Sequence, residues 1–381
     1  MGTAMSSYSP GLEGVIAGES ALCLVDEGES GLLYRGYGIA DLAEHSTFEE
    51  VAYLLLFGHL PTPHEMKDFS AQVAAQSLLP RPVEAFLDSV PQGSHPMDVL
   101  RTGLSILGMT DREAGDNSAE ANVRKSIRLL AQIPLLISAA DRFASGRPLL
   151  SRHQELSCAE NLLYLLTGQK GDARAKAMAR VLDVSLILYA EHEFNASTFS
   201  ARVTASTMTD LHSAITSAIG TLKGPLHGGA NEAVAQMFLE IDSPAKAEPW
   251  VREALAAKRR IMGFGHRVLK NGDARSAIIQ GHAATLSRIC GDHRWYEIAT
   301  VVEQVMREEK GLYPNLDFYT AAAYLLMGIP RTLYTPVFVC SRITGWCAHV
   351  IEQQSHNRLV RPRALYTGPS KREYVPLERR T

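Results

Sequence analysis

Hydrophobic and polar positions follow a strand pattern only near the start of this chain. Two short apolar runs, residues 21–25 and 32–34, flank an acidic, glycine-containing segment over residues 26–31. Short apolar runs on both sides of such a turn are typical of a β-hairpin. We therefore predict one small N-terminal hairpin, with strands only in this region.

The rest of the chain carries helix signals. Apolar side chains recur at helical spacing in two segments, which are Val234, Met237, Phe238 and Ile241, and then Ile278, Leu286 and Ile289. Two pairs have capping-box spacing ahead of an apolar run, Thr47 with Glu50 and Ser157 with Glu160. Thr335 followed by Pro336 resembles an N-cap and a first helical position, which predicts a helix to about Gln354. The fold class predicted is mainly α.

Composition narrows the class of protein. The 381 residues are 46% hydrophobic and 21% charged, which is ordinary for a globular chain of two to three domains. The net charge of −3 provides no general basic field, so we expect no nucleic-acid or membrane partner. Glu13 and Glu19 interrupt the early apolar stretch, so we expect no secretory signal. Five cysteines without a Cys-x-x-Cys pair favour a reducing compartment, and we predict a cytoplasmic protein.

Common cofactor and metal motifs are weak or missing. The segments 36–38 and 263–265 each supply two glycines of a dinucleotide fingerprint but lack the third. There is no Walker A sequence, no Gly-x-Ser-x-Gly and no His-Glu-x-x-His. We therefore predict no bound metal and no tightly bound cofactor.

Three glycine-bearing loops concentrate the candidate chemistry. In residues 223–232, His227 lies between glycines just before a predicted helix, whose free N–H groups would favour a neutral, hydrogen-bond-donating imidazole. A turn-capping histidine is the simpler alternative. Residues 260–270, followed by Arg275, combine glycines, His266 and cations, which suits an anionic ligand or else a solvated basic loop. In residues 313–319, Asp317 stands among apolar neighbours at a helix start, where a helix cap is the simpler interpretation.

Other segments add to these loops. Residues 191–198 contain His192 between two acids, and the C-terminal region contains Arg342, Arg361 and Arg363. Each of these residues alone is equally consistent with a solvated surface position. Two loop histidines, one loop aspartate and several arginines together indicate a dicarboxylate site with acid–base groups.

These segments, in this order, resemble the citrate synthase family. The resemblance runs from residue 11 to residue 363, and its core motifs read GPLHGGANE, GFGHRV, PNLDFYT and EHEFNASTF. It implies an acyltransferase that condenses an acyl-CoA with oxaloacetate and then hydrolyses the thioester. It also implies a two-domain helical fold, with a large domain of residues 1–222 plus 326–381 and a small domain of residues 223–325 that moves as substrate binds.

The same resemblance assigns roles by motif. Asp317 is the implied base, His227 the donor to the thioester oxygen, and His266 the acid for the oxaloacetate carbonyl. The residues implied to hold oxaloacetate are His192, Arg275, Arg342 and Arg361, with Arg361 reaching the neighbouring subunit of a homodimer. The residues implied to wrap CoA are Arg260, Ile261, Met262, Gly263 and Phe264. Ser77 departs from the arginine that many short bacterial members carry nearby.

The acyl group is the open question. Residues 15–20 and 94–103 look closer to the 2-methylcitrate synthase branch, so we favour propionyl-CoA, with citrate synthase of the tricarboxylic acid cycle as the alternative. One methylene changes discrimination by only about 1–3 kcal/mol, so dual activity is realistic. Two further alternatives are a catalytically silent acyl-CoA-binding homologue and a metal-dependent lyase that uses His192, His227 and His266.

Overall fold

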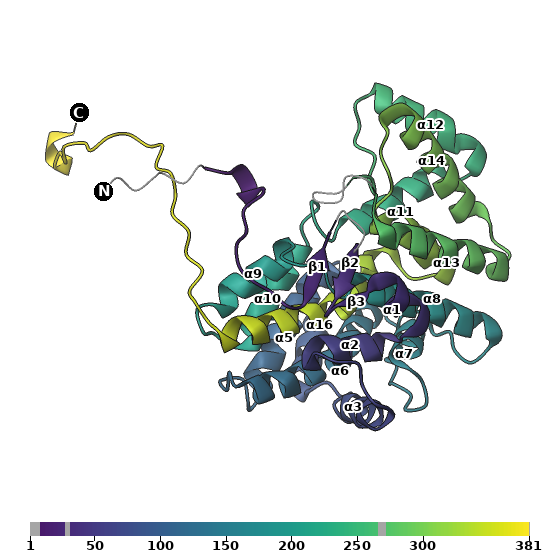
Figure 1. Cartoon of the computed structure of the whole chain (residues 1–381), viewed down its shortest axis with the longest axis horizontal. Coiled ribbons are helices and arrows are strands. Elements are labelled where there is room, and N and C mark those ends of the chain that lie inside the picture. The colour runs from purple at the N-terminus through teal and green to yellow at the C-terminus, as the bar shows by residue number, and fades with distance from the viewer. Residues whose placement is uncertain (1–7, 27–30, 266–271, 381) are drawn as a thin grey trace.

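The computed structural model describes residues 8–26, 31–265 and 272–380. Within these ranges the chain forms sixteen α-helices and one small sheet (Figure 1). The helices are α1 (Ile39–His45), α2 (Phe48–Phe57), α3 (Pro63–Ala75), α4 (Arg81–Asp88), α5 (Pro96–Thr110), α6 (Ala119–Ala144), α7 (Cys158–Thr167), α8 (Ala173–Tyr189), α9 (Ala196–Ala205), α10 (Leu211–Leu222), α11 (Ala230–Ile241), α12 (Pro244–Ala256), α13 (Ala274–Cys290), α14 (Arg294–Lys310), α15 (Leu316–Met327) and α16 (Tyr334–Ser355). The prediction of a mainly α fold is confirmed.

The predicted hairpin is present as β1 (Cys23–Val25) and β2 (Leu32–Tyr34), which pair antiparallel. A third strand that the sequence did not predict, β3 (Tyr37–Gly38), pairs antiparallel with β2. Gly36, at a φ of 88°, lies in the tight turn between β2 and β3. The first of the two partial dinucleotide fingerprints is therefore part of a β-turn.

Local sequence signals explain where several helices begin. The capping boxes at Thr47 and Ser157 are both present, and Thr62 forms a third one before α3. In each, the side-chain oxygen accepts from the N3 main chain while the N3 glutamate accepts from the cap. The pattern at Thr335 was misleading, because α16 begins at Tyr334 with Leu333 as its N-cap. The Thr335 hydroxyl instead donates to Glu232.

The apolar stripes were only partly right. All four stripe residues of α11 are buried, as predicted. In α13, Leu286 is buried but Ile289 is 48% exposed, and the helix buries Ile279 and Ala283 instead. A stripe read from three widely spaced residues does not fix the buried face of a helix.

The helices form two groups, and the larger one consists of α1 to α10 and α16. Helix α16 lies at its centre. Every residue from Tyr334 to Val350 is buried, because α16 packs against α2, α6, α8, α9 and α10. Ser341 is one of its polar side chains that find a partner, since it donates to the main-chain oxygen of Leu186 on α8. This packing holds one face of α16 against the C-terminal end of α8.

A second group consists of α11 to α15, and Figure 1 shows α11 to α14 on the right side of the molecule. In this group α15 packs against α11, α13 and α14, and it also contacts α8 of the larger group. The C-terminal segment after α16 runs away from both groups (Figure 1). In the described part of the chain, every helix is too short or too polar to cross a membrane.

Candidate active site

Asp317 lies in the first turn of α15 but does not cap it. The N-cap is Asn315, whose Oδ1 accepts a hydrogen bond from the main-chain N of Asp317 at 3.1 Å. The helix-cap interpretation of Asp317 is therefore wrong. Asn315 also donates twice, from Nδ2 to the main-chain oxygen of Gly265 at 3.1 Å and from its main-chain N to the oxygen of Gly263 at 2.9 Å. These bonds tie the start of α15 to the glycine loop.

The carboxylate of Asp317 faces Tyr189 at the end of α8. The hydroxyl of Tyr189 donates to Asp317 Oδ1 at 2.6 Å, and Asn231 Nδ2 donates to that hydroxyl oxygen at 3.0 Å. Because the amide donates, it directs the tyrosine proton toward Asp317. Burial raises the pKa of Asp317 to about 6, although the Tyr189 hydrogen bond and the charge of Arg275 oppose the rise. Asp317 is thus ionised at neutral pH and more basic than an exposed aspartate.

The imidazole of His227 lies against the start of α9. Its Nε2 is 2.8 Å from Oγ of Ser197 and accepts from the main-chain N of Ser197 at 3.3 Å. A nitrogen that accepts from a main-chain N–H carries no proton, so the neutral ring holds its proton on Nδ1. Burial, followed by the charge of Arg342, lowers the pKa of His227 to about 4. The prediction of a neutral donor is supported, but the helix start that contacts it is that of α9 and not that of α11.

Two of the predicted arginines are buried near these groups. Arg275 donates to both carboxylate oxygens of Asp273, from Nε at 2.9 Å and from Nη2 at 2.8 Å. Arg342 donates from Nε to the main-chain oxygen of Tyr189 at 2.6 Å. Its Nη1 is buried and makes no hydrogen bond to any residue that the structure describes. A buried guanidinium nitrogen in this state suits an anionic ligand.

Phe338, on α16, connects the candidate groups. Its ring centroid lies 4.3 Å from that of Tyr189 and 6.3 Å from that of His227. The guanidinium carbon of Arg342 lies 4.7 Å from the same ring. The base partner, the neutral histidine and the buried cation therefore surround one aromatic side chain.

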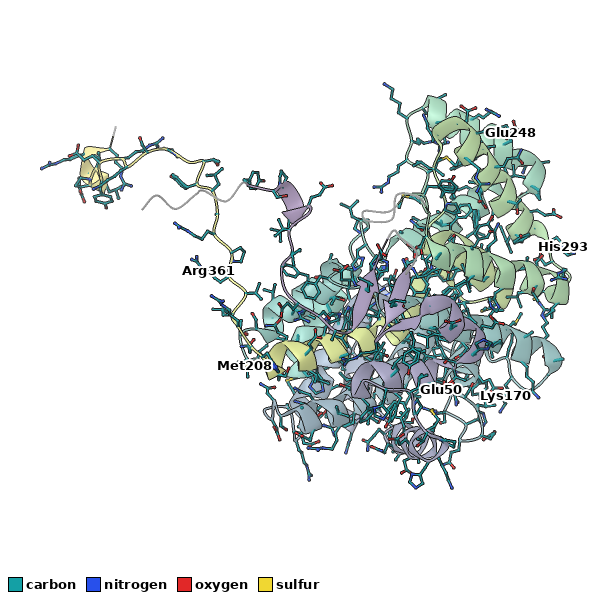
Figure 2. The ribbon with its side chains drawn as sticks, in the orientation of Figure 1. Glu50, Lys170, Met208, Glu248, His293 and Arg361 are labelled. Atoms are coloured by element: carbon teal, nitrogen blue, oxygen red, sulfur yellow. The ribbon has the colours of Figure 1, made fainter. Side chains whose placement is uncertain are left out.

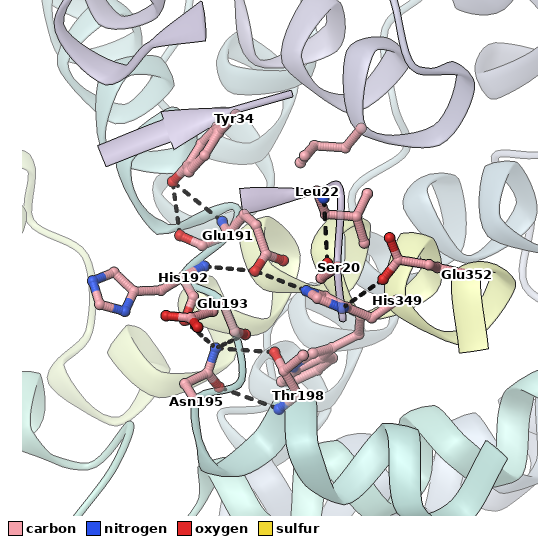
Figure 3. A network of polar contacts seen from close by, with 12 residues as sticks. Ser20, Leu22, Tyr34, Glu191, His192, Glu193, Asn195, Thr198, His349 and Glu352 are labelled. Atoms are coloured by element: carbon pink, nitrogen blue, oxygen red, sulfur yellow. Dashed lines mark hydrogen bonds and ion pairs between the residues drawn. The ribbon is translucent and has the colours of Figure 1, made fainter. Parts of the chain in front are cut away.

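His192 occupies the turn between α8 and α9 and is 8% exposed. Its main-chain N donates to Oε1 of Glu191 at 2.8 Å, and its main-chain oxygen accepts from Asn195 at 3.3 Å. Figure 3 shows the His192 ring on the opposite side of this turn from His349. The turn thus holds the imidazole away from the buried side chains of Glu191 and His349.

The segment predicted to wrap CoA is largely packed into the second group of helices. Arg260 is exposed, whereas Ile261 and Phe264 are 5% and 8% exposed. A Cβ on Gly263, which has a φ of 84°, would lie 2.8 Å from Phe318. Only the main chain and Arg260 are therefore well placed to meet a ligand, with Met262 partly buried.

Several predicted residues are not gathered into this cluster. His266 lies outside the described residues. Arg361 is exposed on the C-terminal segment, away from the helices (Figure 2). Ser77 donates to the main-chain oxygen of Val73 and accepts from Arg152, which are contacts near the end of α3. Among the described residues, no three His, Cys, Asp or Glu side chains gather as a metal site.

Sequence reasoning missed several residues that build the site, and four of them show why. Ser197 and Glu191 lie inside the motif around His192. The motif therefore indicated their region but not the residues to which they hydrogen-bond. Asn231 lies in the His227 motif. Tyr189 had no signal, because an apolar helix end is an ordinary place for a tyrosine.

Comparison with known proteins identifies the class. A family model described as "Citrate synthase, C-terminal domain" matches residues 11–363. The chain belongs to the citrate synthase family and is a condensing enzyme of that type.

Relatives and solved structures agree with this assignment. The chain is 45% identical over 381 residues to a 2-methylcitrate synthase from Shewanella oneidensis, covering 100% of both chains. It is 44% identical to citrate synthase 2 of Bacillus subtilis, covering 97% of this chain and 98% of the relative. The citrate synthase of Thermoplasma acidophilum, solved with carboxymethyl coenzyme A and oxaloacetate, superposes with a TM-score of 0.91 at 34% identity, covering 98% and 100% of the two chains. The prediction of family and fold is confirmed.

Proposed function

We propose that the cluster around Phe338 is the condensation site and that Asp317 is its base. The observation that supports this role is the partly buried carboxylate, held by Tyr189, with its pKa raised to about 6. A base of this strength is ionised at neutral pH yet accepts a proton from carbon more readily than an ordinary aspartate. His227, neutral with its proton on Nδ1, donates to the thioester oxygen and stabilises the enolate.

The reaction then follows in two stages. Asp317 takes a proton from the carbon next to the thioester carbonyl, and that carbon attacks the ketone carbon of oxaloacetate. His266, which lies outside the described residues, protonates the oxygen of the former ketone. Water then cleaves the thioester, which releases the tricarboxylate and free CoA. No tightly bound cofactor or metal is needed for these steps.

The oxaloacetate carboxylates are held by His192, Arg275 and Arg342, with Arg361 supplied by the neighbouring subunit of a homodimer. The buried Nη1 of Arg342 supports this assignment within one chain. The exposed position of Arg361 on the outlying C-terminal segment is compatible with a reach into a second copy. The main chain of residues 260–264 and the Arg260 side chain contact CoA.

The site also joins two bodies that move. We assign residues 1–222 and 326–381 to a large domain, and residues 223–325 to a small one that closes on substrate. The Tyr189–Asp317 bond and the 3.4 Å bond from Arg275 Nη1 to the main-chain oxygen of Leu188 both cross between them. Closure would then complete the catalytic set and exclude water during condensation. A cytoplasmic location accords with the five free cysteines.

For the acyl group we propose propionyl-CoA, which makes the enzyme a 2-methylcitrate synthase of propionate metabolism with citrate synthase activity beside it. Relatives named citrate synthase and 2-methylcitrate synthase match at 44% and 45% identity, so identity alone does not separate them. A relative named citrate/2-methylcitrate synthase, from Bacillus subtilis, matches at 44% and supports dual use.

The test is release of free CoA thiol from acetyl-CoA and from propionyl-CoA, each with and without oxaloacetate. We expect release only with oxaloacetate, and a higher kcat/KM for propionyl-CoA. A higher kcat/KM for acetyl-CoA would overturn the acyl assignment and leave the mechanism intact. Absence of oxaloacetate-dependent release, with CoA binding retained, would instead indicate the silent acyl-CoA-binding alternative.

A further inference from the structure

A chain of buried polar side chains lies beneath the turn that carries His192 (Figure 3). Glu191 has no exposed surface, and its Oε1 accepts from the main-chain N of His192 at 2.8 Å. The same oxygen accepts from Nε2 of His349, which is also fully buried, at 3.0 Å. A buried carboxylate is costly unless donors satisfy it. These two donors therefore set the position of Glu191.

The direction of the hydrogen bonds follows from Arg202 on α9. Its Nη1 is 2.9 Å from Nδ1 of His349, and because arginine only donates, Nδ1 is the acceptor. The His349 proton is therefore on Nε2 and points at Glu191. Arg202 is itself anchored, since it donates to Glu352 at 2.6 Å and to Gln353 at 3.1 Å. The chain of donors runs from Arg202 through His349 to Glu191.

Gly345 on α16 closes this arrangement from the other side. A Cβ at position 345 would lie 2.2 Å from Oε2 of Glu191 and 2.4 Å from the main-chain oxygen of Ala190. Oε2 is buried and makes no hydrogen bond to the residues described here. The turn thus approaches α16 as closely as glycine permits, and a side chain at position 345 would push it away.

One face of α16 carries both these contacts and an arginine of the site. Arg342, Gly345 and His349 stand at positions i, i+3 and i+7, which share a helix face. The contacts that place Glu191 therefore also set the separation between the His192 turn and Arg342.

We propose that Glu191, oriented by His349, is a positioning residue for oxaloacetate binding. It fixes the main chain of His192 and hence the aim of the His192 imidazole relative to Arg342. This inference rests on the proposed function, in which both residues hold oxaloacetate. Glu191 should therefore affect the binding of oxaloacetate and not the binding of acyl-CoA.

The test compares Glu191→Ala, His349→Ala and His349→Gln in steady-state kinetics. For Glu191→Ala and His349→Ala we expect the KM for oxaloacetate to rise about 10- to 100-fold, while the KM for acyl-CoA changes little. His349→Gln keeps one donor and one acceptor, so we expect its KM for oxaloacetate to stay near the wild-type value. Gly345→Ala should act in the same direction as Glu191→Ala.

Glu49→Ala is the matched control. Glu49, on α2, is also a buried carboxylate whose Oε1 accepts from a main-chain N, that of Cys158 at 2.6 Å. Its Oε2 is likewise buried, without a hydrogen bond to the described part of the chain. We expect Glu49→Ala to lower Tm but to leave the KM for oxaloacetate unchanged. The rise in Tm on adding oxaloacetate alone gives a second readout, which should shrink in Glu191→Ala, His349→Ala and Gly345→Ala but not in His349→Gln or Glu49→Ala.

The outcomes distinguish a failure of the positioning role of Glu191 from a failure of the proposed function. If the Glu191 and Glu49 variants both lose stability and both keep the wild-type KM for oxaloacetate, Glu191 is merely structural and the inference is overturned. If Glu191→Ala does not fold, the difference between His349→Ala and His349→Gln decides the matter, and equal KM values for the two would overturn it. If the wild-type enzyme shows neither oxaloacetate-dependent CoA release nor an oxaloacetate-induced Tm shift, the proposed function itself fails.

Discussion

His227 and Asp317 are both partly buried titratable groups of the candidate site, yet their pKa values move in opposite directions. Burial lowers the pKa of His227 to about 4 and raises the pKa of Asp317 to about 6. The cause is the same in both, because a low-dielectric surrounding disfavours whichever form carries charge. Histidine is charged when it is protonated, so burial lowers its pKa. Aspartate is charged when it has lost its proton, so burial raises its pKa.

The partners of the two groups differ in a way that suits different roles. His227 accepts at Nε2 from Ser197, which leaves its other nitrogen as a donor. Asp317 accepts from Tyr189, which restrains the rise in its pKa and leaves it ionised at neutral pH. One burial effect thus produces a neutral hydrogen-bond donor on one side of the site and a strengthened base on the other.

The largest expected effect comes from removing the base. Asp317→Asn keeps the shape and can still accept from Tyr189, but it cannot take a proton, so we expect kcat/KM to fall about 10³-fold. Thiol-release kinetics would measure the loss. Asp68→Asn, at an exposed aspartate of α3, is the control and should leave activity unchanged.

The same variant has a predicted effect on stability. The pKa of Asp317 is higher in the folded state than its ordinary value of 3.8, so its favourable contribution exists at low pH and is lost as pH rises through about 6. The amide introduced by Asp317→Asn carries no charge to desolvate, and we expect the variant to be more stable than wild type at pH 8 by roughly 2–3 kcal/mol. Equal denaturant midpoints for Asp317→Asn and wild type at pH 8 would contradict the interpretation that burial destabilises the ionised Asp317 carboxylate.

His227→Ala should have the next largest effect. It removes a single donor to the developing oxyanion, and we expect kcat to fall about 10²-fold. Because the ring is neutral, the fall should be nearly constant between pH 6 and pH 9. A loss confined to low pH would indicate that a charged imidazole takes part, and the contrast with Asp317 would then break down.

Tyr189→Phe should have the smallest effect and sharpen the comparison most. The Tyr189 hydrogen bond lowers the pKa of Asp317, so its loss raises that pKa and moves the acid limb of the kcat/KM profile upward by about one pH unit. Arg275, Asp273 and Arg342 also act on this pKa and are unchanged in the variant. Activity should recover at high pH.

Tyr319→Phe, two residues after Asp317, provides the matched control. Its hydroxyl donates to Glu303 and not to Asp317, so its acid limb should coincide with that of wild type. An unshifted limb in Tyr189→Phe as well would show that the hydrogen bond does not tune the base.

Much of the fold was predictable where the signal was local. The capping boxes at Thr47 and Ser157 and the stripe of α11 depend on residues three or four apart, and all three are present. The predicted N-cap of α16 was wrong because Thr335 meets Glu232, which is 103 positions away. The prediction for Ile289 was wrong because α13 packs through a neighbouring face, which buries Ile279 and Ala283.

The candidate site divides in the same way. The motifs contain His192, Arg275 and Arg342, which are buried, and His227 and Asp317, which are partly buried. Tyr189 lies 128 positions from Asp317, and His349 lies 158 positions from Glu191, so no spacing rule relates either pair. These partners became visible only once α8, α15 and α16 were packed together.

By itself the sequence determined the helical class, the family and the residue types that carry the chemistry, because these depend on short-range patterns and contiguous motifs. The tertiary structure alone decided which nitrogen of His227 holds the proton, how basic Asp317 is, and which buried groups hold the His192 turn. The reason is physical. Protonation and orientation depend on burial and on donors brought from distant parts of the chain, and neither is encoded in the neighbouring residues.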